Sequence, residues 1–414
     1  MPKGLIKTPI PGGGLGWSAI DQKEIDAVVS VLKNPKYLFR YSSELETQCS
    51  GFEREACEKL GFKHALMVAS GTSALTLCLS AYGIGPGDEV IIPGYTYIST
   101  ASAVVTAGAV PVIAEIDNSL GLDPDDVEKK ITPYTKAIII VHMQGVPGRL
   151  KAIRDIAKKH KLVVIEDACQ AIGSKYNGVS TGIGSDALAW SLNFYKVITC
   201  GEGGVFFTND DDAFIRGVNA HDPGSPMWKE GLTQDSNIAP FTMLGTRGNE
   251  VSAAIARVQL TKLDGILEKT RALKKKLISR LAKPLNYTLQ HVDDPEGDCG
   301  ISIALIANTR EKAQKLYGTL AEEGLNIGTA FNEGFPDRHI YSYWDAIIEK
   351  RSPSPAGYPW KDPSYKGNVS YTNDMCPNTL DILGRCMRFG INTAMNDTNM
   401  EEIAAAINYA DANV

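Results

Sequence analysis

The sequence of 414 residues lacks paired cysteines. Its eight cysteines form no C-x-x-C pair, and none stands at a spacing typical of metal ligands. Several lie among apolar residues, as Cys78 does between Leu77 and Leu79. Thiols of this kind are typical of a reducing compartment, so we expect neither a disulfide framework nor a metal site.

The sequence also lacks an excess of positive charge and a long apolar run. Its net charge is −6, and the basic residues form no stripe, which argues against nucleic acid as a partner. No segment approaches the length of a membrane-spanning helix, and the first residues lack the apolar core of a secretory signal. We therefore expect a soluble, cytoplasmic protein with small molecules as its ligands.

What the chain does contain is a regular alternation of apolar, strand-like runs with helical segments. We expect strands at 64–69, 89–93, 110–115, 137–142, 162–167, 187–192 and 205–208. Repeated βαβ units of this kind predict an α/β fold with a mostly parallel central sheet flanked by helices.

Both ends of the chain depart from this alternation. Residues 1–16 are rich in proline and glycine and indicate an extended arm, and helical spacing follows from Ser18, a plausible cap, to Leu32. Near the other end, a long helical connector leads to a strand at 301–307 and to helices that indicate a smaller α+β domain. Because the length favours two domains, we expect a large domain at 1–270 and a small C-terminal domain at 271–414.

One edge of the predicted sheet gathers residues capable of chemistry. Ligands of parallel α/β sheets bind beyond the carboxyl ends of the strands, where Ser70 to Thr72, Tyr95 to Tyr97, Glu166 to Gln170 and Lys196 all fall. The first of these stretches joins a strand to a helix N-terminus, whose N–H groups and dipole favour an anion. An ordinary helix cap accounts for the same residues equally simply.

Lys196 stands between two apolar strands and directly before a glycine-rich turn, Gly201-Glu202-Gly203-Gly204. A lysine in such a place is poorly solvated, which lowers its pKa and makes its amine a usable nucleophile. The alternative is a surface lysine in a hairpin loop.

Taken together, these residues fit the requirements of pyridoxal phosphate. The aldehyde of this cofactor forms a Schiff base with a lysine, its ring nitrogen needs a carboxylate, its phosphate needs N–H and hydroxyl donors, and its ring needs an aromatic partner. Lys196, Asp167, Ser70-Gly71-Thr72 and Tyr97 would supply these in turn. Taken singly, a strand-end acid is more often solvated and a tyrosine after a strand is more often part of the core.

The sequence resembles the DegT-type sugar aminotransferases, which are fold-type-I pyridoxal phosphate enzymes. The similarity lies in four motifs, which occur in the family's order: 69–75, 86–93, 164–171 and 191–204. Within the family, the segments 39–41, 141–143, 198–204 and 294–298 are similar to the subgroup that makes 8-amino-3,8-dideoxy-octulosonate. The stretch from Gly328 to Arg388 diverges more, and we expect substrate-contacting loops there.

The resemblance implies a role for each matching position. Lys196 would hold the cofactor covalently and, once released, move the substrate proton. Asp167 would pair with the ring nitrogen, and Gln170 would contact the ring phenol oxygen. Tyr97 would stack on the ring, and the phosphate would lie against Gly71, Thr72 and Ser191.

The family's fold also implies a homodimer with active sites at the subunit interface. The Asn that reaches the partner's phosphate in relatives is replaced here by Gly245. Either Asn249 or a water would substitute for it, or the loop would approach the phosphate differently. Weaker candidates for substrate contacts are Arg40, Tyr41, His221, Arg247 and His339. His142, at a strand end, is expected to be structural rather than catalytic.

The leading hypothesis is a pyridoxal-phosphate-dependent transaminase. It would move an amino group from glutamate or glutamine to a keto- or aldehydo-sugar, or to a related polyol carbonyl, by a ping-pong mechanism. One alternative is a sugar dehydratase or another elimination or condensation enzyme, although the family's dehydratases carry His at the position of Lys196. An alternative of another class is a non-catalytic sensor that binds the cofactor or a sugar.

Overall fold

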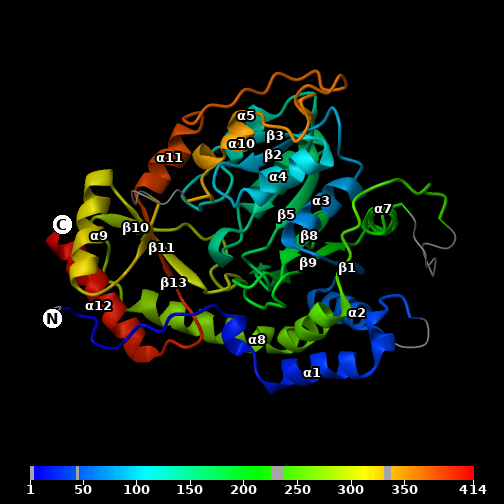
Figure 1. The fold of residues 1–414 in the computed structure, drawn as a ribbon. Coiled ribbons are helices and arrows are strands. Elements are labelled where there is room, and N and C mark those ends of the chain that lie inside the picture. The colour runs from blue at the N-terminus through cyan, green and yellow to red at the C-terminus, as the bar shows by residue number, and fades with distance from the viewer. Residues whose placement is uncertain (1–3, 43–45, 225–235, 331–336) are drawn as a thin grey trace.

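The structure, a computed structural model, describes residues 4–42, 46–224, 236–330 and 337–414. Two sheets organise these residues (Figure 1), a large one built from the first half of the chain and a small one built from its last third. The long helix α8 (Glu250–Ser279) runs along the lower side of the view, beneath both sheets. The predicted boundary at residue 270 falls inside this helix and stays a prediction.

In the described residues the large sheet has seven strands in the order β1-β9-β8-β5-β4-β2-β3. The strands are β1 (His64–Val68), β2 (Glu89–Pro93), β3 (Val110–Ala114), β4 (Thr135–Val141), β5 (Val163–Asp167), β8 (Ala187–Ser191) and β9 (Gly204–Thr208). Neighbouring strands pair in parallel, except that β9 pairs antiparallel with both β1 and β8. This confirms the predicted, mostly parallel sheet.

Helices cover both faces of the large sheet because its strands alternate apolar side chains between the two faces. In β1, Leu66 and Val68 pack with one apolar cluster, whereas Ala65 and Met67 pack with another. The first face is covered by α3 (Gly71–Ala81), α4 (Ser99–Ala107) and α7 (Asp211–His221). The second face is covered by α2 (Gln48–Leu60), α5 (Pro124–Lys130), α6 (Leu150–His160) and α8.

The small sheet is antiparallel, in the order β10-β11-β13-β12, and it confirms the predicted C-terminal α+β part. Its strands are β10 (Tyr287–Leu289), β11 (Ser302–Ala307), β12 (Gly328–Thr329) and β13 (Cys386–Gly390). The end of α8, α9 (Arg310–Glu322) and α12 (Asp397–Asn413) share one apolar core with this sheet. Two shorter helices, α10 (Asp345–Ile348) and α11 (Pro377–Gly384), lie between β12 and β13 in the chain.

The arm has no helix or strand between residues 4 and 16, as its composition predicts. Helix α1 (Gln22–Lys33) begins later than predicted. The cap is Asp21 rather than Ser18, because Asp21 accepts a hydrogen bond from the N–H of Lys23 while Glu24 bonds back to the N–H of Asp21. The sequence also predicts a helix from Glu44 to Leu60, and its predicted first residue, Glu44, lies outside the described residues.

Among the described helices, none combines the length and the apolar character that a membrane crossing needs.

Candidate active site

A cavity of about 750 Å³ lies beyond the carboxyl ends of the parallel strands. It is the place where an α/β sheet of this topology binds its ligands. Seven predicted cofactor-binding residues line it, namely Gly71, Thr72, Tyr97, Asp167, Gln170, Ser191 and Lys196, and so does His339, a predicted substrate residue. We call it the cofactor cavity.

Lys196 reaches this cavity from the loop that joins β8 to β9. The loop is held in place by its own backbone, since the N–H of Lys196 donates to Asn193 and the N–H of Cys200 donates to Leu192. The carbonyl of Lys196 accepts from the N–H of Gly16 at 3.1 Å, which ties the arm to this loop. Lys196 is only partly buried, and its neighbours Phe194 and Tyr195 are exposed, so the lysine is not enclosed between strands.

Asp167 ends strand β5 and is buried, with 5% of its surface exposed. Both carboxylate oxygens have partners, because Oδ1 accepts from the N–H of Cys169 at 3.1 Å and Oδ2 accepts from the Thr100 hydroxyl at 3.0 Å. Thr100 is itself bonded to Thr96 at 2.7 Å. These bonds fix the orientation of a carboxylate that lines the cavity.

The turn between β1 and α3 is the place where the sequence predicts an anion site. Ser70 caps the helix by accepting from the N–H of Ser73 at 3.1 Å, while the first N–H groups of the helix have no partner within the helix. A Cβ on Gly71 would lie 2.7 Å from the Cβ of Ser191, so only glycine lets the turn approach β8 this closely. Gly71 and Thr72 at the start of α3 therefore line the same cavity as Ser191 at the end of β8.

Tyr97 and His339 form an aromatic border of the cavity. Their ring centroids are 5.3 Å apart, and the Tyr97 side chain remains 45% exposed. Gln170 lies deeper, where its Oε1 accepts from the N–H of Gln144 at 3.1 Å.

From Gln144 a chain of hydrogen bonds crosses to the small sheet. Gln144 donates through Nε2 to the Tyr95 hydroxyl at 3.0 Å, and Arg388 donates through Nη1 to the same hydroxyl. Arg388 also donates through Nη2 to Asp337 at 2.8 Å, and the Asp337 carboxylate pairs with His339 at 2.7 Å. Burial raises the pKa of the Tyr95 hydroxyl to about 12, so it stays protonated.

Arg388 was not among the residues that the sequence predicted, although it lines the cavity and marks the end of the divergent stretch from Gly328. The available signal was a cation inside the apolar strand Cys386-Met387-Arg388-Phe389, where a charge needs a partner or a function. Thr100 was missed as well, because its role depends on a contact with Asp167 that only the fold creates.

His142 and Glu166 form a buried network behind the cavity. His142 donates through Nε2 to Glu166 at 2.8 Å and accepts at Nδ1 from the N–H of Gly148 at 3.1 Å. Burial opposes the ionisation of Glu166, but His142, Arg154 and Ser185 outweigh it and hold the pKa of Glu166 at about 2. These contacts agree with the expectation that His142 is structural.

Five predicted residues are not among the described residues that line the cofactor cavity. They are Arg40, Tyr41, His221, Arg247 and Asn249.

Four of these five lie near β1. Arg40 pairs with Glu53 at 2.5 Å, and the Tyr41 hydroxyl donates to Asp222. His221 and Arg247 approach the same Asp222 carboxylate at 3.4 and 3.6 Å.

The fifth, Asn249, caps helix α8 by accepting from the N–H of Ser252 at 2.9 Å. Within one chain its side chain therefore serves the helix and not the cavity.

The donor set of the cavity fits pyridoxal phosphate. An amine, an oriented buried carboxylate and a helix N-terminus line the same cavity, and the glycine at position 71 lets the helix N-terminus lie close to Ser191. In the described part of the chain, no group of His, Cys, Asp or Glu residues is arranged to hold a metal ion.

Comparison with known proteins agrees with this geometry. The model of the DegT/DnrJ/EryC1/StrS aminotransferase family matches residues 18–354. GDP-perosamine synthase of Caulobacter vibrioides is 40% identical over 219 residues, which make up 51% of this chain and 56% of that protein, so the alignment spans about half of this relative's length.

Among solved structures, DesV of S. venezuelae is 28% identical with a TM-score of 0.74, over 94% of this chain and 95% of that one. 3-Amino-5-hydroxybenzoic acid synthase is 24% identical with a TM-score of 0.78, over 99% of this chain and 100% of that one. These similarities confirm the predicted fold class, a pyridoxal phosphate enzyme fold of type I with a smaller α+β part.

Proposed function

The chain belongs to the DegT/DnrJ/EryC1/StrS aminotransferase family, and from this membership we propose that it is a pyridoxal-phosphate-dependent aminotransferase. Its amino donor would be glutamate or glutamine, and its acceptor a keto- or aldehydo-sugar or a related polyol carbonyl. The reaction would proceed in two half-reactions of the ping-pong kind.

One observation carries the proposal, namely that Lys196, Asp167 and the N-terminus of α3 line one cavity although they are far apart in the sequence. Each has an ordinary explanation alone. A nucleophilic amine, a fixed carboxylate and an anion site in a single cavity are the set that this cofactor requires.

When bound, pyridoxal phosphate would supply an aldehyde that carries the amino group and a ring that stabilises negative charge at the substrate carbon. Asp167 would hold a proton at the ring nitrogen, and Thr100 and the N–H of Cys169 keep its carboxylate in place. Lys196 Nζ would hold the cofactor and, once released, act as the base that moves the substrate proton. The N–H groups of Gly71 and Thr72 and the hydroxyl of Ser191 would bind the phosphate.

We also propose a homodimer whose second subunit completes each site. Arg40, Tyr41, His221 and Arg247 lie close together near β1 but do not line the described cofactor cavity of their own chain. Such an arrangement suits a contribution to the partner's site. The side chain of Arg247 remains 45% exposed, as a contact with a ligand on a neighbouring subunit would require.

A hybrid dimer tests this arrangement. Lys196→Ala and Arg247→Ala are each expected to abolish or strongly reduce transfer as homodimers. Co-expressed with different tags, they form hybrids in which one site carries both changes and the other neither, so about half of the wild-type activity returns. Hybrids that stay as inactive as the two homodimers would contradict the shared site.

The reaction itself is tested by following the visible band of the bound cofactor while single amino donors are added. Glutamate or glutamine is expected to bleach the band, and a panel of keto- and aldehydo-sugars to restore it. Mass spectrometry of the sugar product separates amino transfer from dehydration, the alternative reaction. A sugar product that has lost water and gained no nitrogen would favour the dehydratase.

A further inference from the structure

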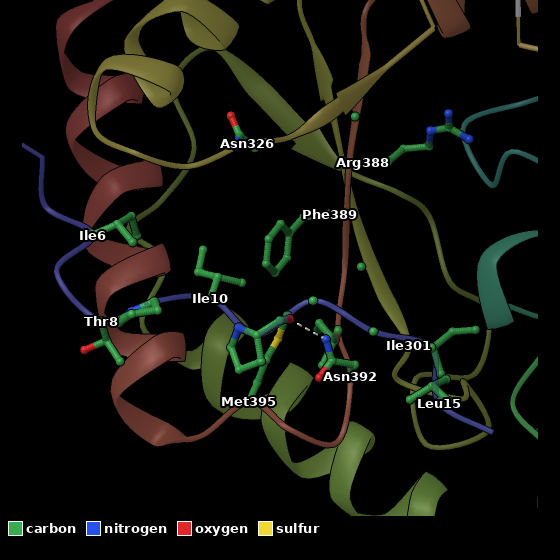
Figure 2. Close-up of a pocket in the computed structure, with 18 of the residues that line it drawn as sticks. Ile6, Thr8, Ile10, Leu15, Ile301, Asn326, Arg388, Phe389, Asn392 and Met395 are labelled. Atoms are coloured by element: carbon green, nitrogen blue, oxygen red, sulfur yellow. Dashed lines mark hydrogen bonds between the residues drawn. The ribbon is translucent and has the colours of Figure 1, made fainter. Parts of the chain in front are cut away.

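A second cavity, of about 720 Å³, lies between the N-terminal arm and strand β13. Figure 2 shows the arm running along one side of it, with Ile10 and Phe389 directed into the space between arm and strand. Asn326, in the turn before β12, lies on the opposite side (Figure 2). We call this space the arm cavity.

The arm is a fixed wall because α12 and its surroundings bind it at several points. Glu402 accepts from the N–H groups of Lys7 and Thr8 at 3.0 and 2.8 Å. Asn399 donates to the carbonyl of Pro9 at 3.3 Å, and Asn392 donates to that of Pro11 at 2.8 Å. An arm that only covered the sheet would not need this set of polar anchors.

The arm cavity and the cofactor cavity meet at a shared border. Leu15, Tyr195, Ile301 and Arg388 line both of them. The border lies beside the reactive lysine, because Gly16, the next residue of the arm, donates to the Lys196 carbonyl at 3.1 Å. A ligand that reacts at Lys196 and extends past Arg388 therefore enters the arm cavity.

We propose that the arm cavity is a second compartment of the acceptor site, so that the arm selects acceptors by length. This inference rests on the proposed aminotransferase function and adds to it where the far end of the acceptor lies. The occupant is the polyhydroxylated chain that extends from the reacting carbonyl.

The lining of the arm cavity suits such a chain. Ile10, Phe389 and Met395 offer apolar surface for its C–H groups, and Asn326 and the peptide groups of residues 12–14 offer hydrogen bonds for its hydroxyls. Arg388 adds donors at the border, because only two of its five N–H groups have partners among the described residues. At Gly12 an added Cβ would have nothing within 4 Å, so the wall there is open.

The test compares two amines that mimic aminated products of different length, D-glucamine and aminopropanediol, on the cofactor-loaded enzyme. The measured quantity is the amine concentration that bleaches half of the visible band. Glucamine can form several hydrogen bonds of about 1 kcal/mol each that aminopropanediol cannot form. Its half-bleaching concentration is therefore expected to be at least about tenfold lower than that of aminopropanediol.

Asn326→Trp and Gly12→Trp each place a large side chain on a residue that lines the arm cavity, one in the segment before β12 and the other in the arm. Each is expected to raise the half-bleaching concentration of glucamine about tenfold while changing those of aminopropanediol and glutamate less than about twofold. The matched control is Gly318→Trp on α9, which is exposed, also has open space around it and lines neither cavity. Glucamine is further expected to slow amide hydrogen exchange in residues 6–16, and aminopropanediol is not.

The outcomes separate this inference from the function on which it rests. If neither glutamate nor glutamine bleaches the band, the aminotransferase proposal fails. If a donor bleaches the band but glucamine has no lower half-bleaching concentration than aminopropanediol, the second compartment is wrong and the proposed function stands. The same holds if the half-bleaching concentration of glucamine is unchanged in both tryptophan variants.

Discussion

Arg388 and Asp337 form an ion pair beside the cofactor cavity, with Nη2 of the arginine 2.8 Å from Oδ2 of the carboxylate. Arg388 belongs to strand β13 and lines the cavity, whereas Asp337 lies two residues before His339 and pairs with it. Although burial opposes it, the combined effect of His339 and Arg388 lowers the pKa of Asp337 well below its ordinary range. The pair therefore fixes an anion and a cation where the two sheets approach each other.

We expect the pair to be strongly coupled. Arg388→Met leaves a mostly buried carboxylate that has lost its arginine partner and keeps only its hydrogen bonds with His339, and a loss of about 3 kcal/mol in the free energy of unfolding follows. In a double-mutant cycle with Asp337→Asn, urea unfolding should give a coupling energy of about 1–3 kcal/mol. Additive effects of the two substitutions would show that the ion pair contributes nothing to stability.

We expect Glu166 to make the free energy of unfolding depend on pH in the acidic range. Its pKa of about 2 lies below the ordinary 4.5, so its contribution is complete above pH 4.5 and is lost as the pH falls towards 2. At 1.36 kcal/mol per pKa unit this contribution is roughly 3 kcal/mol. Glu166→Gln lacks the titration, so the stability difference between wild type and variant should shrink from about pH 6 towards pH 3 in urea titrations.

The control for this measurement is Glu58→Gln, on the exposed face of α2. It should lower stability by less than about 1 kcal/mol at any pH, because exposed ion pairs contribute little. A Glu166→Gln variant as stable as the wild type at neutral pH would contradict the account of the buried network.

Cys169 should resist alkylation although it lines the cofactor cavity. Burial raises the pKa of its thiol well above the ordinary value, and the Asp167 carboxylate raises it further, so little thiolate exists at pH 8. Iodoacetamide should modify Cys169 at least about 100-fold more slowly in the folded protein than in urea, as measured by peptide mass spectrometry. Cys169 is partly buried by accessible surface, so rapid modification of the folded protein would contradict the raised pKa of its thiol.

Asp167→Asn should separate the binding of the cofactor from its chemistry. The amide oxygen can still accept from the N–H of Cys169, and the amide NH2 can donate to the Thr100 hydroxyl, but the side chain carries no charge to hold a proton at the ring nitrogen. We expect the visible band to persist while the rate of bleaching by the amino donor falls about 100-fold or more. Thr100→Val, which only loosens the carboxylate, should reduce the rate far less, and equal losses in both variants would argue against the role of the charge.

The large sheet was predictable because its strands are buried on both faces and therefore appear as continuous apolar runs, as at Glu89–Pro93 and Val163–Asp167. Gly71, Asp167 and Lys196 could be placed at one edge because a strand end fixes the neighbouring residue locally. The start of α1 was mispredicted because Asp21 forms a capping box with Glu24 and outcompetes Ser18.

What the sequence could not predict depends on contacts between distant segments. The hydrogen bond from Arg388 to Tyr95 joins residues 293 positions apart, and no local pattern signals it. The arm cavity has the same origin, since one wall comes from residues 6–15 and the other from the region around β13. Both follow from how the small sheet and the arm pack beside the large sheet.

The central claim is that Lys196 holds and uses the cofactor, and the visible spectrum tests it most directly. Loaded with pyridoxal phosphate, the wild-type protein should absorb at roughly 410–430 nm and lose this band when glutamate or glutamine is added. Lys196→Ala should lack the band and the donor-dependent bleaching, and should not transfer an amino group. A wild-type protein without the band, or a Lys196→Ala variant that still transfers, would contradict the account.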